Sequence, residues 1–189
     1  MNRLFSAAVC ASLLSIGLSS CVYKDTRHHI VVSVPQQQMA LVTEGRLERI
    51  YPVSTSKFGL GDIPSSNCTP MGEMEIAEKI GHNLPPGAVL KDQRFTGEVV
   101  RPNTPGRDAI VSRILCLKGL EQQNARAHGR CIYIHGTAEE SKIGVPASYG
   151  CVRMRAFDVM DLFEKVGSGA HVTITLAPWQ YFIPAAPRT

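Results

Sequence analysis

Residues 155–176 read RAFDVMDLFEKVGSGAHVTITL, and within this stretch the spacing of apolar residues changes from helical to alternating. The first half places apolar residues every three or four positions, which predicts a helix with one buried stripe. That stripe comprises Ala156, Val159, Met160, Phe163 and Val166. Gly167 suits the end of such a helix. From His171 to Leu176 apolar and polar residues alternate, so a strand is expected to follow.

Upstream of this stretch the chain shows no second convincing helix. Short β-branched or alternating runs predict strands at 29–34, 39–43, 47–54, 74–80, 109–117 and 130–135. Between 54 and 71 the chain is rich in Ser, Gly and Pro and predicts a loop. Many short strands with one helix predict a mainly β fold, a sandwich or barrel.

The N-terminal residues indicate export. Residues 1–20 combine a short positive end with an apolar run too short to span a bilayer, which is typical of a signal peptide. The run ends in Leu18-Ser19-Ser20-Cys21, which resembles a bacterial lipobox whose cysteine, Cys21, would be lipidated. A plain secretory signal is the alternative. We expect a tether at 21–29, a folded domain at 30–177 and a C-terminal tail at 178–189.

This organisation implies a lipoprotein of the cell envelope that faces the periplasm and is held to a membrane by its lipid. Val22 after the cysteine favours the outer membrane. The net charge of +4 is mild and no dense Lys/Arg run occurs, so nucleic acid is not expected as a partner.

The remaining cysteines can be interpreted in two ways. In an oxidising compartment an even set could pair completely, whereas a catalytic thiol would leave three. The set is Cys68, Cys116, Cys131 and Cys151. No CxxC motif and no Cys/His pair at zinc spacing occurs, so neither a metal nor a cofactor is expected. His82, His128 and His171 have no partners nearby in sequence and are interpreted as surface histidines.

Two short segments carry candidate chemistry. Residues 132–137 read IYIHGT, a strand ending in His135, and residues 148–153 read SYGCVR, a tight turn carrying Cys151. A thiolate is a strong nucleophile and an imidazole can serve as its base. If the helix began close to Cys151, its dipole would favour the thiolate. The N–H groups around Gly150 and Cys151 could form an oxyanion hole. A purely structural cysteine is the alternative.

These segments together resemble the L,D-transpeptidase (YkuD-type) family, in the motifs His135-Gly136-Thr137 and Ser148-Tyr149-Gly150-Cys151-Val152-Arg153. Thr69-Pro70-Met71-Gly72 and Ser54 resemble two further family positions. The resemblance covers roughly residues 30–176. His135 precedes Cys151, an order that disfavours papain-like peptidases.

The resemblance implies an acyltransferase that acts on peptidoglycan stem peptides. Cys151 would attack the carbonyl before the terminal D-Ala of a tetrapeptide stem and form a thioester, with His135 as base and the Gly136 carbonyl orienting its ring. An amine would resolve the thioester, from another stem or from a lysine of a murein-attached lipoprotein. Ser148, Tyr149 and Gly150 would surround the substrate, and Arg153 could bind a stem carboxylate, although a surface arginine or a partner of the helix start is an equal alternative.

One position departs from the pattern, because many family members have a histidine where this chain has Tyr149. A phenol cannot act as a base at neutral pH. Two alternatives therefore stay open: hydrolysis of the same acyl-enzyme by an L,D-carboxypeptidase or amidase, and an inactive lipoprotein that only binds peptidoglycan. Family members also carry aromatic residues where this chain has Cys116 and Cys131, which suggests that a disulfide replaces them.

Overall fold

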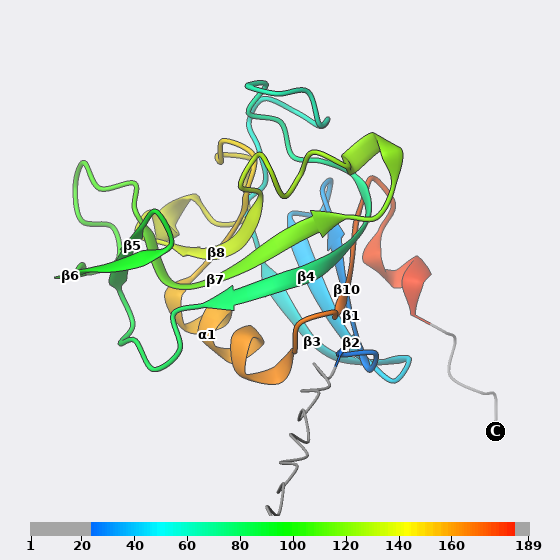
Figure 1. Cartoon of the computed structure of the whole chain (residues 1–189), viewed down its shortest axis with the longest axis horizontal. Coiled ribbons are helices and arrows are strands. Elements are labelled where there is room, and N and C mark those ends of the chain that lie inside the picture. The colour runs from blue at the N-terminus through cyan, green and yellow to red at the C-terminus, as the bar shows by residue number, and fades with distance from the viewer. Residues whose placement is uncertain (1–23, 184–189) are drawn as a thin grey trace, which may run out of the picture.

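A computed structural model describes residues 24–183 (Figure 1). It is built from ten strands, one α-helix and three short 3-10 helices. The strands are β1 (His28–Ser33), β2 (Gln38–Thr43), β3 (Arg46–Pro52), β4 (Gly72–Ile80), β5 (Ala88–Lys91), β6 (Arg94–Val99), β7 (Ile110–Gly119), β8 (Tyr133–Thr137), β9 (Val152–Met154) and β10 (His171–Thr175). The helices are α1 (Ala156–Lys165), η1 (Gln122–Asn124), η2 (Glu140–Lys142) and η3 (Trp179–Phe182).

All ten strands belong to one mixed sheet, ordered β3-β2-β1-β10-β4-β7-β5-β6. Strand β8 pairs with β7, and β9 pairs with β8. The last strand, β10, lies between β1 and β4, so strands from opposite ends of the described chain are neighbours in the middle of the sheet. The mainly β fold with one helix is confirmed, and the strands β5, β6 and β9 are additions to the predicted set.

The main core lies on one face of the sheet. Alternation along β1 and β10 sends Ile30 and Val32, together with Val172 and Ile174, into this core. Helix α1 packs against β7 and β8, as Figure 1 shows, and fully buries Phe163. A side chain of that size contributes about 3 kcal/mol by leaving water. The predicted buried stripe of α1 is correct at four of its five positions. The fifth, Met160, is only partly buried, and Leu162, which was not in the predicted stripe, is buried.

The folded part extends beyond the predicted 30–177 at both ends. Asp25 is buried, and its carboxylate accepts hydrogen bonds from the Gly167 N–H at 2.6 Å and from His28 at 2.7 Å. After β10, Trp179 packs on Val31 with its indole N–H donating to Gln38 at 2.9 Å. Cys21 and the predicted signal peptide lie outside the described residues. Among the helices of residues 24–183, none is long and apolar enough to cross a bilayer.

Candidate active site

The candidate site is built on the parallel pair β8–β9. Its register sets Ile134 against Val152 and His135 against Arg153. Ile134 and Val152 point into the main core, so the alternation of the strands turns Tyr133 and His135 to the opposite face. Cys151 immediately precedes β9, with its side chain toward the same face as that of Arg153. The two candidate catalytic residues therefore come from adjacent segments on one face of the sheet.

The His135 ring is held in one orientation. Its Nδ1 lies 2.8 Å from the Gly136 carbonyl, and because a carbonyl can only accept, Nδ1 carries the proton and the Nε2 lone pair remains available. Burial lowers the pKa of His135 to about 4, against the opposing effect of the Gly136 carbonyl. At neutral pH His135 is therefore an uncharged acceptor, the form that a general base requires.

The sulfur of Cys151 lies between two main-chain groups. The Tyr133 N–H donates to Sγ at 3.4 Å, and the thiol donates to the Cys131 carbonyl at 3.4 Å. Burial raises the pKa of Cys151 to about 11, although the Tyr133 N–H and the charge of Arg153 act in the opposite direction. Within residues 24–183, no hydrogen bond joins Sγ to His135.

The helix dipole does not lie next to this thiol. Strand β9 separates Cys151 from α1, which begins only at Ala156. Since dipole effects fade beyond the first helical turn, the condition for a helix-stabilised thiolate is not met. The Tyr133 N–H, at the start of β8, is the donor that contacts the sulfur instead.

The turn at residues 148–151, called the nucleophile turn below, is held by hydrogen bonds from side-chain hydroxyls. Gly150 has a φ of +122°, a conformation that favours glycine, and its carbonyl accepts from Thr69 Oγ1 at 2.9 Å. Ser148 Oγ donates to the Cys151 carbonyl at 2.6 Å and accepts from the Gly150 N–H at 3.2 Å. The Gly150 N–H, one of the two predicted oxyanion donors, is thus engaged within the turn.

Residues from the upstream motifs also form hydrogen bonds with this turn and with the start of β9. Ser54 pairs with Arg153 through two main-chain hydrogen bonds of 2.9 and 3.0 Å. Ser56 pairs with Ser148, and its N–H donates to Thr69 Oγ1 at 3.0 Å. Segments separated by about a hundred positions in the chain therefore hold Cys151 in place.

Arg153 forms ion pairs with two acidic side chains. Its side chain is only 6% exposed, and its guanidinium contacts Asp108 at 2.8 Å and Glu139 at 3.3 Å. To bind a substrate carboxylate, as the sequence suggests, it would have to leave one of these partners. Arg153 is therefore a buried ion-pair partner, unlike the surface arginine or helix-start partner that the sequence analysis offered as its alternative.

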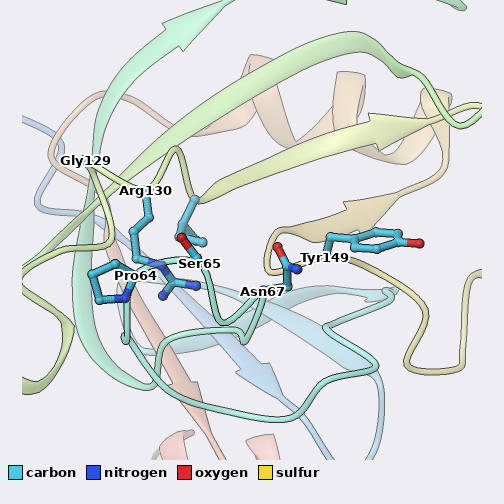
Figure 2. Close-up of a pocket in the computed structure, with 7 residues that line it drawn as sticks. Pro64, Ser65, Asn67, Gly129, Arg130 and Tyr149 are labelled. Atoms are coloured by element: carbon cyan, nitrogen blue, oxygen red, sulfur yellow. The ribbon is translucent and has the colours of Figure 1, made fainter.

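Tyr149 packs at the surface against Phe58 and Lys57. It is 53% exposed, its ring lies 5.5 Å from that of Phe58, and its hydroxyl accepts from Lys57 at 3.1 Å. A cavity of about 310 Å³ lies beside the nucleophile turn, lined by Asn67, Arg130 and Tyr149 among others. Figure 2 shows the Arg130 side chain reaching toward Ser65 while the Tyr149 ring extends away from Arg130.

Cys116 and Cys131 are free thiols in the structure, as are Cys68 and Cys151. Cys116 is buried, which raises its pKa to about 12, and Cys131 is exposed. Their disulfide stays a prediction.

No sequence pattern predicts the main-chain contacts of Cys151 with Tyr133 and Cys131, because almost any residue can supply an N–H or a carbonyl. The pairing of Arg153 with Asp108 and Glu139 was also missed, since loops bring those acids together. The Thr69-Pro70-Met71-Gly72 motif points to Thr69, but it does not predict the hydrogen bond from Thr69 to the Gly150 carbonyl.

The fold is a mainly β domain that carries His135 on β8 and Cys151 immediately before the paired strand β9, an arrangement that defines a candidate Cys/His site. The L,D-transpeptidase catalytic domain family (YkuD) matches residues 27–174. Because this match covers most of the chain, the protein belongs to that family.

Sequence relatives agree with this assignment. A Bacillus subtilis relative named as an L,D-transpeptidase, YqjB, is 26% identical over 147 residues, or 78% of this chain and 70% of its own. An Escherichia coli relative of the same designation, YcfS, is 24% identical over 88% of this chain. The chain spans only 50% of the length of YcfS.

Solved structures share the fold. An L,D-transpeptidase from Mycobacterium smegmatis superposes with a TM-score of 0.53 at 14% identity, covering 79% of this chain and 58% of that one. L,D-transpeptidase 3 from Mycobacterium tuberculosis, solved with a faropenem-derived adduct, superposes with a TM-score of 0.52 at 15% identity. The match covers 79% of this chain and 60% of that one.

Proposed function

We propose that this protein is an L,D-transpeptidase that transfers peptidoglycan stem peptides through a thioester on Cys151. The observation that supports this most directly is the β8–β9 pair, which sets Cys151 and a neutral, oriented His135 on one face. Attack by a thiol needs both a base and a donor to the sulfur, and the Tyr133 N–H supplies the second.

The first half-reaction follows from these groups. The thiol leaves the Cys131 carbonyl and passes its proton to Nε2 of His135 while Sγ bonds to the carbonyl carbon before D-Ala. The Gly150 N–H is engaged with Ser148, so we infer that the Cys151 N–H is the oxyanion donor. When the C–N bond breaks, His135 returns the proton to the departing D-Ala amine, and the thioester remains.

The second half-reaction needs an amine acceptor. His135 removes a proton from that amine as its nitrogen attacks the thioester, and the Cys151 thiol is regenerated. The acceptor is a diamino acid of a second stem or a lysine of a murein-attached lipoprotein. Water as acceptor would make the protein an L,D-carboxypeptidase.

The test incubates the purified protein with tetrapeptide-bearing muropeptides and follows the products by mass. Cross-linked dimers are expected, together with a thioester adduct on Cys151. Tripeptides alone would identify a carboxypeptidase, and unchanged substrate would leave only a binding role. Cys151→Ala must abolish all products, whereas Cys68→Ala, which removes a thiol outside the β8–β9 pair, must retain them.

We also propose that the domain is lipid-anchored at Cys21 and faces the periplasm, at the outer membrane. The motif Leu18-Ser19-Ser20-Cys21 supports this, and only residues 22 and 23 separate Cys21 from the first described residue. The lipid would therefore hold the active domain close to the membrane surface. Labelling with a radioactive fatty acid should mark the chain, and Cys21→Ala should lose the label; a labelled Cys21→Ala chain would contradict the proposal.

A further inference from the structure

Two histidines and a glutamate gather on three neighbouring strands outside the candidate active site. His29 lies on β1, His171 on β10 and Glu73 on β4, and each of these strands pairs with the next. His29 is directly opposite His171, and Glu73 is directly opposite Thr173. The side chains lie on the face opposite the main core, because the adjacent Ile30, Val172 and Met74 point into that core.

The ligand atoms of this cluster converge. One ring nitrogen of each histidine and one Glu73 oxygen all lie within 4.8 Å of one another. His171 Nε2 is 3.2 Å from Glu73 Oε2, and the two imidazole rings have centroids 5.1 Å apart. A tetrahedral zinc ion needs ligand atoms roughly 3.4 Å apart. The His171 side chain is 45% exposed, so its ring is free to make the remaining movement.

A supporting hydrogen bond orients two of these groups. Because the Thr173 hydroxyl donates to the Glu73 carboxylate at 2.9 Å, it accepts from His29 Nε2–H at 2.7 Å, which leaves Nδ1 of His29 as the nitrogen with a free lone pair. Metal-binding histidines and carboxylates are commonly held in this way by outer partners. The neighbouring Glu75 is already paired with Lys24 and Lys118, so it neutralises the nearest cations rather than competing for the ion.

Two of the three side chains are open to solvent, since the His171 side chain is 45% exposed and that of Glu73 is 37% exposed. A cavity of about 340 Å³ reaches the cluster at Glu73 and Thr173, although neither histidine lines it. A site with three protein ligands needs such space for a water molecule in the fourth position.

The geometry points to a zinc site formed by His29, His171 and Glu73, in which the ion ties together the central strands β1, β10 and β4. Two imidazoles and one carboxylate suit Zn²⁺, whereas Mg²⁺ and Ca²⁺ prefer oxygen ligands alone. The ligands are separated by 44 and 98 positions in the chain, so no local spacing could predict the site. His171 is a strand-surface histidine, as predicted, but its partners Glu73 and His29 lie far away in the sequence.

The test titrates the reduced, purified chain with Zn²⁺ by calorimetry and follows thermal unfolding. One equivalent should bind and raise Tm, and Mg²⁺ should do neither. His171→Gln and His29→Gln should each weaken binding at least about 100-fold, and Thr173→Val about 10-fold. His128→Gln, which removes an exposed histidine outside the cluster, should bind as the native chain does.

Cysteine thiols also bind zinc, so Cys151→Ala is a second control and should retain the site. Loss of binding in Cys151→Ala with retention in His171→Gln would assign the ion to the thiols and overturn the proposal. Absence of any binding by the folded chain would overturn it too, and would leave the cluster as an ion pair between His171 and Glu73. Neither result depends on the transpeptidase activity.

Discussion

Cys151 and His135, the proposed nucleophile and base, are both uncharged at pH 7, because burial raises the pKa of Cys151 to about 11 and lowers that of His135 to about 4. The resting pair is thus thiol and imidazole, and a thiolate forms only as the proton moves. Such a site protects its sulfur from adventitious reagents, whose attack depends on the thiolate.

Alkylation of Cys151 should therefore be slow at neutral pH and accelerate strongly with pH. Below the pKa, the thiolate fraction rises tenfold per pH unit, so iodoacetamide should react about 100-fold faster at pH 9 than at pH 7. Peptide mass spectrometry can follow Cys151 separately from the exposed Cys131. A rate that is already constant above pH 7 would show an ion pair in place of the neutral pair.

His135 should also make stability depend on pH. The unfolded imidazole binds a proton near pH 6.5, whereas the folded one binds it only near pH 4. Between these values the unfolded state holds more protons, so the free energy of unfolding falls as the pH decreases from 6.5 to 4. His135→Asn should abolish on the order of 3 kcal/mol of that fall. Urea unfolding at both pH values measures it, with the exposed His128→Asn as a control that keeps the fall.

Tyr149 stands at a family position, and its exposed hydroxyl leads us to expect no part in proton transfer. Its hydroxyl contacts only the exposed Lys57. Tyr149→Phe should therefore change kcat by less than about twofold, since an exposed hydrogen bond contributes little. A loss of tenfold or more in the muropeptide assay would show that the phenol acts on the substrate, and Lys57→Met would then reveal whether the lysine acts with it.

At the scale of elements, the close approach of β7 and β8 explains the glycine after the base. A Cβ at Gly136 would collide with the Val111 carbonyl of β7 and press on Val159 of α1. Gly136→Ala should cost about 1–3 kcal/mol in unfolding free energy and displace His135. Gly129→Ala is a matched control, because its nearest atom would be an ordinary 3.7 Å away. Equal stability of the two variants by urea unfolding would argue against the crowding.

The helix and seven of the strands could be predicted because their apolar residues repeat regularly over five or more positions. Strand β9, with three residues, and β5, with four, are too short for such a pattern, and all residues of the edge strand β6 are exposed. His135 and Cys151 could be found from their motifs. The contacts of the sulfur could not, because they involve the main chain and a three-residue strand that the sequence does not reveal.

At the scale of the whole molecule, the segment after β10 is part of the fold. Trp179 packs with Val31 and Ala40 on the face of the sheet opposite the main core. Ending the chain after residue 177 should lower the free energy of unfolding by about 2–4 kcal/mol, because it exposes this apolar surface. Ending it after residue 183 keeps these contacts and should change stability by less than 0.5 kcal/mol. If both shortened chains lost the same free energy of unfolding, η3 would make no contribution to stability.

The position of β10 has a consequence for how the chain matures. Because β10 is inserted between β1 and β4, the two halves of the sheet have no shared edge until almost the entire chain has emerged. Such dependence on contacts between distant residues slows folding. A newly made chain therefore cannot close its sheet before β10 has been made, and the export proposed above would act on a chain whose two sheet halves are still unjoined.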